Sequence, residues 1–298
     1  MRFGIALASA LIGWTAASGA ALAQGACADK LGVARTVEID TTGGPGFGFE
    51  HYKAYDFLRL KEVVLTFDDG PQVNHTHAIL DALAAQCTKA TFFSVGSMAA
   101  GMPEILRDVV KAGHTVGTHT WKHIQIDKIK GGEAEWKAEI EKGFSAASRA
   151  VGDTGSIASF FRFPALKHSK EALEYLASRN IAVFSTDIDS WDYKIQSSDR
   201  LVKSVMDRLE KKTKGIILMH DIRPNTSKAV PTLLAELKAK GYKVVHLKAK
   251  APVKTLAQYD AEVEKSMKGM SAGHDRPMSS VIRTIEEASP SASASAKR

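Results

Sequence analysis

The sequence contains few cysteines: Cys27 and Cys87 are the only two in 298 residues. Two cysteines do not make the disulfide framework that stabilises many small secreted domains. The chain is instead long enough to bury a sizeable hydrophobic core. In an oxidising compartment the two thiols can pair, but the sequence leaves this open because it does not give the distance between them.

Long apolar segments are also absent after residue 23, so no later segment is expected to cross a bilayer. The sequence has no internal repeat. Lys and Arg number 40 against 33 Asp and Glu, which gives a net charge of +7. This excess is spread along the chain rather than gathered in blocks, so nucleic-acid binding is not indicated. We prefer a mildly basic protein that is exported to the vicinity of anionic envelope polymers.

The first 23 residues are typical of a targeting segment. Arg2 precedes an uncharged apolar stretch over residues 3–23 that ends in small residues. This pattern predicts a secretory signal peptide over residues 1–23 and a periplasmic or secreted mature protein, with no stable membrane insertion after cleavage. The alternative is a membrane anchor, but many Ala, Ser, Gly and Thr residues make the stretch weakly hydrophobic. A lipid anchor on Cys27 is disfavoured because residues 24–26 lack the leucine expected before a lipidated cysteine.

The rest of the chain divides into a partly glycine-rich lead-in (24–60), one domain (61–250) and a C-terminal extension (251–298). The extension contains a predicted helix at 255–267 and ends in a Ser/Ala-rich tail that is expected to be disordered. In the domain, strands are predicted at residues 63–67, 90–95, 114–118, 160–163, 181–184, 215–219 and 243–247. Helices are predicted at residues 78–85, 103–111, 133–150, 170–178, 200–211 and 230–240. This alternation indicates an α/β fold with a parallel sheet, which is either open and doubly wound or closed into a barrel.

Polar side chains gather where the predicted strands end. They are Asp68 and Asp69, residues 119–123, Arg162, residues 187–192, and His220 with Asp221. Each group alone has an ordinary explanation, such as a turn, a helix cap or a surface position. Their joint occurrence at the carboxyl ends of parallel strands is typical of a functional site.

The chemistry of these side chains suits metal-assisted hydrolysis. His119 and His123 are four residues apart and can meet on one side of a helical turn. With one carboxylate they make a two-histidine, one-carboxylate site that leaves positions for water and substrate. A second carboxylate nearby can accept a proton from the activated water, and a further histidine can protonate the leaving group.

The order of these segments closely resembles that of the polysaccharide deacetylase family, the NodB-homology domain of carbohydrate esterase family 4. The similar segments are residues 66–71 (TFDDGP), 89–96 (KATFFSVG), 113–123 (GHTVGTHTWKH), 161–164 (FRFP), 189–193 (DSWDY) and 218–221 (LMHD). They occur in the family's order and at familiar spacing. The resemblance covers about residues 61–248.

This resemblance implies a distorted (β/α) barrel with the site at the carboxyl ends of its strands. It also implies one divalent metal, commonly zinc, and hydrolysis of an N- or O-acetyl group on a glycan. The metal ligands would be Asp69, His119 and His123. The catalytic residues would be Asp68 as general base, Arg162 orienting it, His220 as general acid and Asp189 tuning His220.

The expected substrate-binding residues are Pro164, Ala165, Leu218 and Tyr193. Leu218 would form a wall of the acetyl pocket. The third motif departs from the family because Pro164 is followed by Ala165 and Leu166 rather than by an aromatic residue and glycine. Ala165 can still donate its backbone N–H to an oxyanion. Tyr193 stands where tryptophan is usual in the fourth motif.

The resulting hypothesis is an exported, metal-dependent polysaccharide or chitooligosaccharide deacetylase. Two histidines and a carboxylate suit Zn²⁺, Co²⁺ or Ni²⁺ better than Mg²⁺ or Ca²⁺. One alternative is a catalytically silent glycan-binding module on the same fold, and another is a metal-dependent amidohydrolase of a small non-sugar amide. The sequence leaves open which acetylated glycan is the substrate and what the oligomeric state is.

Overall fold

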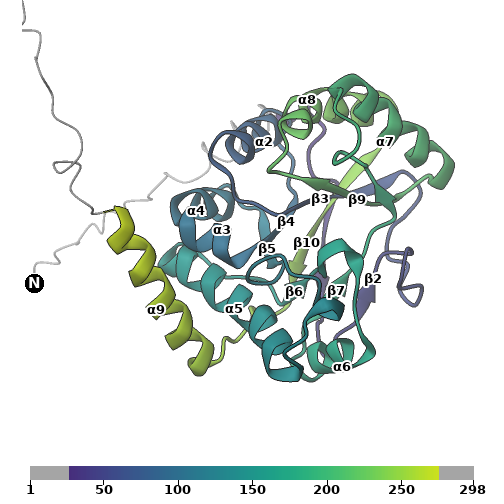
Figure 1. The fold of residues 1–298 in the computed structure, drawn as a ribbon. Coiled ribbons are helices and arrows are strands. Elements are labelled where there is room, and N and C mark those ends of the chain that lie inside the picture. Colours follow the sequence, from purple (N-terminus) through teal and green to yellow (C-terminus); the bar gives the residue numbers. More distant parts are fainter. Residues whose placement is uncertain (1–26, 275–298) are drawn as a thin grey trace, which may run out of the picture.

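The structure is a computed structural model that describes residues 27–274, which form one ten-stranded sheet surrounded by helices (Figure 1). The strands are β1 (Arg35–Ile39), β2 (Gly46–Phe47), β3 (Glu62–Asp68), β4 (Thr91–Ser94), β5 (Thr115–Thr118), β6 (Phe160–Phe161), β7 (Ala182–Phe184), β8 (Ile188–Asp189), β9 (Gly215–His220) and β10 (Lys243–Ala249). The α-helices are α2 (Val73–Ala85), α3 (Gly96–Gly101), α4 (Pro103–Lys111), α5 (Glu133–Val151), α6 (Lys170–Ser178), α7 (Ser198–Lys212), α8 (Pro224–Ala239) and α9 (Ala257–His274). Three short 3₁₀ helices are η1 (Ile126–Lys128), η2 (Gly152–Thr154) and η3 (Pro164–Leu166). The predicted signal peptide and Ser/Ala-rich tail lie outside the described residues.

The sheet follows the order β1-β10-β3-β4-β5-β6-β7-β2, and β9 pairs with both β3 and β8. Every pair of named strands is parallel. Within residues 27–274 the end strands β1 and β2 pair with inner strands but not with each other. The α/β class with parallel strands is confirmed, and the arrangement is that of a distorted barrel rather than an open doubly wound sheet.

Alternation along β3 determines which side chains enter the barrel. Val63, Leu65 and Phe67 belong to the core between the sheet and the helices, whereas Val64 belongs to a second core inside the barrel. Successive side chains of a strand point to opposite faces. Asp68 is four residues from Val64, so its carboxylate points into the barrel at the carboxyl end of β3.

The neighbouring strand β9 repeats this pattern. Ile217 and Met219 pack in the outer core, and Ile216 packs in the inner core. Leu218 and His220 therefore point inward, and His220 lies beside the last residue of β3 in the strand register. Both faces of the sheet are buried, which explains why these strands are almost continuously apolar until their last residues.

The region expected to be only a lead-in contributes to the barrel. Strand β1 pairs with β10 and strand β2 pairs with β7. Ile39, Phe47 and Leu58 are buried in the inner core. Strand β2 has only two residues and lies in the glycine-rich stretch around residue 44, so its sequence shows no strand pattern.

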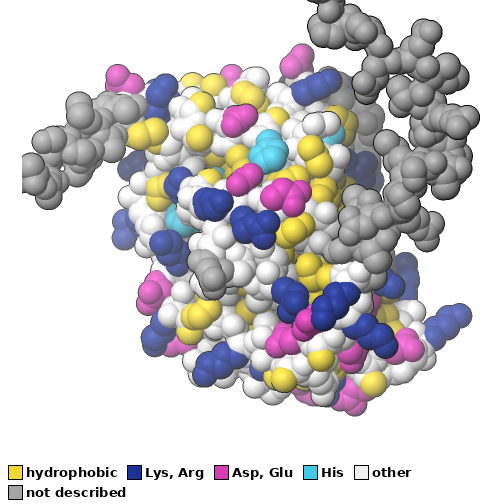
Figure 2. Space-filling view, turned by 90° about the vertical axis from the view of Figure 1, so that its left-hand side faces the viewer, with side chains coloured by type: hydrophobic (Ala, Val, Ile, Leu, Met, Phe, Trp, Pro, Cys, Tyr) yellow, Lys and Arg dark blue, Asp and Glu magenta, His cyan; other side chains and the backbone are white. Residues whose placement is uncertain are grey.

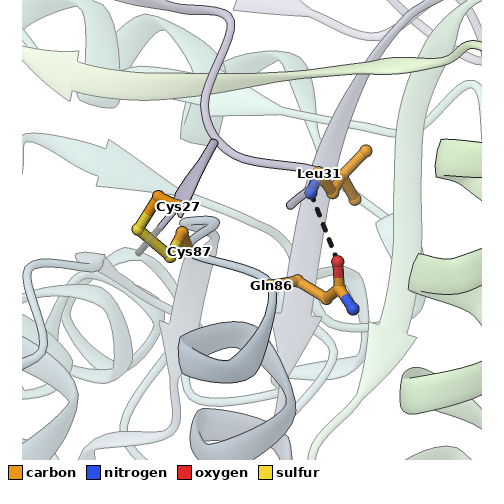
Figure 3. Close-up of a disulfide and its surroundings, with 4 residues drawn as sticks. All are labelled: Cys27, Leu31, Gln86 and Cys87. Carbon is orange, nitrogen blue, oxygen red and sulfur yellow. Dashed lines mark hydrogen bonds between the residues drawn. A yellow bond between two sulfur atoms is a disulfide. The ribbon is translucent and has the colours of Figure 1, made fainter. Parts of the chain in front are cut away.

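A disulfide joins the start of the described chain to the end of α2 (Figure 3). Cys27 and Cys87 are bonded across a sequence separation of 60 residues. Two hydrogen bonds accompany the bridge: the Leu31 N–H donates to Gln86 Oε1 (3.2 Å), and the Gly32 N–H donates to Gln86 O (2.9 Å). The structure thus pairs the two cysteines, a question that the sequence left open.

The outer surface carries charges of both signs. Figure 2 shows the side that lies to the left in Figure 1, where Lys and Arg side chains are interspersed with Asp and Glu. Helix α9 packs on α5 and α3. Among residues 27–274, no helix combines the length and the apolar character needed to cross a bilayer.

Candidate active site

A cavity of about 380 Å³ opens at the carboxyl ends of the strands. Its lining residues are Asp68, Asp69, His119, His123, Phe163, Ala165, Leu166, Asp189, Tyr193, Leu218, His220 and Arg223. The strand ends therefore bring together most of the residues that the sequence predicted for the site. Arg162 lies behind this wall and is fully buried.

Three predicted metal ligands meet on one side of the cavity. Asp69 Oδ1 lies 3.5 Å from His119 Nε2 and 3.2 Å from His123 Nε2. One ligand atom from each residue lies within 4.8 Å of the others. The ring centroids of the two histidines lie 4.9 Å from each other. Residues 119–123 form an irregular turn with positive φ at Thr120 and His123, so the expected helical turn is wrong although the two rings do meet.

The hydrogen bonds around these atoms fit a bound cation. His119 Nδ1 lies 2.7 Å from the carbonyl oxygen of Arg162, which can only accept, so His119 carries its proton on Nδ1. His119 Nε2 then presents a lone pair toward Asp69 Oδ1. That oxygen is buried and has no hydrogen-bond donor among the described residues. Two electron-rich atoms that face each other without a proton are the arrangement that a metal ion satisfies.

Two of these ligands have unusual backbone conformations. Asp69 has a φ of 80° and His123 a φ of 59°, both in the left-handed region. Side chains other than glycine adopt this region rarely, although Asp and His do so more often than most residues. The turns after β3 and β5 therefore hold these side chains toward the cavity at some conformational cost.

Asp68 and Arg162 form a buried ion pair beside the three predicted metal ligands. Arg162 Nη1 donates to Asp68 Oδ1 (2.7 Å) and to Thr66 Oγ1 (2.8 Å). Its Nη2 donates to the carbonyl oxygen of Ser185 (2.8 Å). Burial raises the pKa of Asp68 to about 6, although the charge of Arg162 opposes this rise. The carboxyl group thus titrates closer to neutrality than an exposed aspartate does.

His220, beside Asp68 in the strand register, is held by Asp192. His220 Nδ1 lies 2.6 Å from Asp192 Oδ1, and the His220 backbone N–H donates to Asp192 Oδ2 (2.7 Å). Thr226 Oγ1 also donates to Asp192 Oδ2 (2.6 Å). Burial alone would lower the pKa of His220, but the hydrogen bond and charge of Asp192 outweigh it and raise this pKa to about 9.

The contact with His220 that the sequence assigned to Asp189 is thus made by Asp192. Asp189 instead accepts hydrogen bonds from the Trp191 N–H and the Tyr193 hydroxyl, both at 3.0 Å. The two aspartates stand three residues apart in one motif, so either could have been the partner of His220. Asp192 was missed because the turn after β8 reverses the chain and carries the later carboxylate toward β9.

The third motif forms one wall of the cavity. Ala165 and Leu166 line it and have φ values of 52° and 57°, whereas Pro164 is buried and lies outside the lining. Leu166 donates its N–H to Phe163 O. The Ala165 N–H has no acceptor among the hydrogen bonds of the described residues. A free backbone donor therefore lies on the cavity wall.

Comparison with known proteins shows the family. The family model described as polysaccharide deacetylase matches residues 58–184. A chitooligosaccharide deacetylase of Sinorhizobium fredii is 30% identical over 194 residues, which cover 64% of this chain and 79% of that protein. The chain belongs to the polysaccharide deacetylase family.

Other members of the polysaccharide deacetylase family extend well beyond the shared region. Peptidoglycan-N-acetylglucosamine deacetylase PgdA of Listeria monocytogenes is 33% identical over 187 residues, which cover 62% of this chain and only 38% of PgdA. The solved peptidoglycan deacetylase of Bdellovibrio bacteriovorus has a TM-score of 0.65 and 33% sequence identity, with 73% of this chain and 59% of that chain covered.

The family model ends before part of the site begins. Asp68, Asp69, His119, His123 and Arg162 fall within the matched residues 58–184. The turn after β8 and the histidine at the end of β9 lie beyond that match. Asp221 also lies beyond it: this buried carboxylate accepts from the Gly70 N–H (2.8 Å) and from Thr76 Oγ1 (2.7 Å), and so fixes the loop that carries the aspartate pair. The sequence offered Asp221 only as a neighbour of His220.

Proposed function

We propose that this protein is an exported, metal-dependent deacetylase that hydrolyses N-acetyl groups of a hexosamine glycan. One observation carries the proposal. A ligand-type cluster, a buried aspartate–arginine pair and a histidine–aspartate pair surround one cavity of about 380 Å³. Hydrolysis of an amide needs a site for its oxygen, a base for water and an acid for the departing amine, and each has a candidate here.

Asp69, His119 and His123 would hold one divalent transition metal. Two imidazoles and a carboxylate favour Zn²⁺, with Co²⁺ or Ni²⁺ as replacements, over Mg²⁺ or Ca²⁺. When bound, such an ion supplies Lewis acidity for the acetyl carbonyl and for water. The hydrogen bond from His119 Nδ1 to the Arg162 carbonyl supports this assignment because it fixes the ring and leaves Nε2 free.

Asp68 is the general base. The residue lies at the end of β3 and is 1% exposed, and its Oδ2 is 4.0 Å from His119 Nε2. Arg162 occupies Oδ1, so Oδ2 is the oxygen that takes the proton from the attacking water. A pKa of about 6 suits this role, because the group is ionised at neutral pH and yet basic enough to accept a proton.

His220 is the general acid. Asp192 engages Nδ1, which leaves Nε2 to donate a proton to the sugar nitrogen. The pKa of about 9 keeps the imidazole protonated at neutral pH. The amine is a poor leaving group unless it is protonated, so this proton is needed most for N-acetyl substrates.

The remaining cavity wall receives the acetyl group. Leu218 is 5% exposed and lines the cavity two residues before His220 on β9, where its side chain contacts the methyl group. The free N–H of Ala165 donates to the oxyanion, which is the former carbonyl oxygen after water has attacked the carbonyl carbon. Tyr193 contacts the sugar ring from the other side.

The substrate class is supported by the relatives, which are described as peptidoglycan or chitooligosaccharide deacetylases. Both kinds of polymer contain N-acetylglucosamine, and we assign a glycan of this sugar as the substrate. Such polymers lie outside the cytoplasm, and this agrees with a signal peptide over residues 1–23 and with a periplasmic or secreted protein.

The test is acetate release by the purified mature protein from a panel of acetylated compounds. The panel contains chitooligosaccharides, peptidoglycan, acetylxylan and small cyclic amides. Activity on the first two, lost after exhaustive chelation and restored by Zn²⁺, is the expected result. Full activity in protein from which no metal can be detected would overturn the metal assignment.

Two other outcomes would replace the proposed function. Tight binding of a glycan without acetate release by the metal-loaded protein would indicate a catalytically silent binding module. Turnover restricted to the cyclic amides would indicate an amidohydrolase of small molecules. Acetate release from acetylxylan alone would show that the protein hydrolyses O-acetyl rather than N-acetyl groups.

A further inference from the structure

Exposed aromatic side chains border the cavity on the β8 side. Few large apolar side chains are exposed in residues 27–274, and two of them, Trp191 (43% exposed) and Tyr193 (38%), follow Asp189. Tyr193 lines the cavity, whereas Trp191, two residues earlier in the same turn, is not among the lining residues. An exposed apolar surface continuous with a polar cavity is typical of a ligand groove.

The backbone of Trp191 is held in an unfavourable conformation. Its φ is 59°, in the left-handed region that bulky residues rarely adopt. Asp189 Oδ1 accepts its N–H (3.0 Å), and its carbonyl oxygen accepts the N–H groups of Lys194 (2.8 Å) and Ile195 (2.9 Å). A strained residue that the surrounding hydrogen bonds over-determine is a reason to look for a function.

One face of the indole is supported from below. The Arg208 guanidinium carbon lies 3.2 Å from the centroid of the Trp191 ring. Arg208 also donates to the carbonyl oxygen of Asp189 through Nη1, so the arginine is itself fixed. The ring is thus held rigidly while a large part of it stays open to solvent. A rigid side chain loses little conformational entropy when a ligand binds to it.

The ammonium group of Lys194 lies over both aromatic rings. Lys194 Nζ is 5.5 Å from the ring centroid of Trp191 and 5.4 Å from that of Tyr193. A sugar ring has an apolar face of C–H groups and a rim of hydroxyl groups. It therefore stacks on the negative face of an aromatic ring while its hydroxyl groups accept hydrogen bonds from a nearby ammonium group.

We infer that Trp191 is a binding residue for the sugar that neighbours the one being deacetylated, so that the protein prefers oligosaccharides to single sugars. Asp189 links the two parts of this groove, because it holds the Trp191 backbone and the Tyr193 hydroxyl with its two oxygens. The inference rests on the proposed function and adds the location and chemistry of an adjoining subsite.

The experiment compares Trp191→Ala and Trp191→Phe with the unchanged protein on N-acetylglucosamine oligomers of increasing length and on 4-nitrophenyl acetate. For Trp191→Ala we expect kcat/KM to fall roughly tenfold on oligomers, mainly through KM, and to stay unchanged on the ester. Trp191→Phe keeps an aromatic face and should recover most of the loss. Tyr55→Ala removes an exposed aromatic ring outside the cavity and serves as the matched control.

Binding of the same oligomers to metal-depleted protein, measured by calorimetry, gives a readout that does not need turnover. Weaker binding of oligomers by Trp191→Ala, but not by Tyr55→Ala, supports the subsite even if no acetate is released and the proposed function fails. Equal losses on the ester and the oligomers, or unchanged affinity and kcat/KM on the oligomers, would overturn it.

Discussion

Asp68 and Asp69 are adjacent in the sequence, yet their carboxylates have different surroundings. Asp68 belongs to the last position of β3 and is bonded to Arg162, whereas Asp69 lies in the following turn and faces two imidazoles. Strand alternation directs Asp68 into the barrel, whereas the left-handed φ of Asp69 (80°) turns the next carboxylate back toward the same cavity. The same residue type therefore serves two tasks that substitution can separate.

We expect Asp68→Asn and Asp69→Asn to fail differently. Asp68→Asn removes the proton acceptor, so turnover should fall by roughly 10²–10⁴ while the metal stays bound. Asp69→Asn replaces a charged ligand with a neutral one, so metal affinity should fall first, and excess Zn²⁺ should restore part of the rate. Acetate release and metal content, measured for both variants, test this assignment. It is reversed if Asp68→Asn loses the metal while Asp69→Asn keeps both metal and rate.

For residues at strand ends, the sequence gives a direction as well as a position, because alternation points Asp68, Leu218 and His220 inward. A turn has no period that fixes where a side chain points. Asp69, His119 and His123 lie in turns and could be named only from their residue types and from the motifs that resemble the family. The assignment to Asp189 instead of Asp192, and the absence of Trp191 from the predicted site, both fall in the turn after β8.

The partner of His220 can be tested by its effect on pH dependence. Asp192 raises the pKa of His220 to about 9, so the protonated acid persists up to that pH. In Asp192→Asn the charge is lost and burial lowers this pKa, so activity should decline at a lower pH on the alkaline side. Asp189→Asn is the matched control and should leave the alkaline limb in place. The measurement is kcat/KM against pH on an N-acetyl oligosaccharide, and a shift in Asp189→Asn alone would restore the original assignment.

At the scale of elements, the sequence predicted the strands and helices with strong periodicity. Helices over 103–111 and 170–178 have the bounds of α4 and α6. Strands β1, β2 and β8 and helix α3 were missed. Both β2 and β8 have only two residues, and α3 has six, so none is long enough to show a period. The three strands exist because neighbouring strands pair with them, whereas the first N–H groups of α3 donate to the carbonyl oxygens of Thr120 and Trp121 in the turn after β5.

The missed segment around β2 supports Arg162, the residue proposed to orient the general base. The Ser185 N–H donates to Phe47 O (2.7 Å), and the Glu50 N–H donates to Thr186 O (3.0 Å). These contacts hold the stretch whose Ser185 carbonyl accepts from Arg162. The family model begins at residue 58, so this support comes from a part of the chain outside the match.

Gly48 is the point at which this support can be disturbed. A Cβ at Gly48 would lie 2.7 Å from Ser185 C and from Thr186 N, whereas one at Gly43 would meet nothing within 4 Å; both glycines have positive φ, 98° and 73°. Gly48→Ala should displace the Ser185 carbonyl and lower kcat roughly 10- to 100-fold while the metal stays bound. Gly43→Ala carries the same kind of backbone strain, about 1–2 kcal/mol, without the collision and should keep its kcat. Similar kcat values for the two variants would show that the position of the N-terminal segment does not affect catalysis.

At the scale of the whole molecule, stability and chemistry depend on different parts of the chain. The barrel encloses an apolar core, and the site occupies only the carboxyl ends of its strands. The Cys27–Cys87 bridge lies just after the end of α2. In the sequence, strand β1, which pairs with β10, separates Cys27 from the segment around β2 that supports Arg162. Loss of the bridge is therefore expected to affect the unfolding equilibrium more than turnover.

The disulfide gives the last prediction. It closes a loop with a sequence separation of 60 residues, and a bridge of this kind restricts the unfolded chain. The double variant Cys27→Ser/Cys87→Ser should lose about 2–5 kcal/mol of unfolding free energy, because its unfolded state is no longer restricted. At temperatures where it stays folded, its kcat should match that of the unchanged protein, since β1 and β2 still pair in the sheet. Denaturant unfolding and acetate release measure the two effects, and reducing agent should destabilise the unchanged protein but not the double variant. Two free thiols in the denatured, unreduced protein would show that the bridge does not form, and a loss of kcat in the folded double variant would show that it also positions the site.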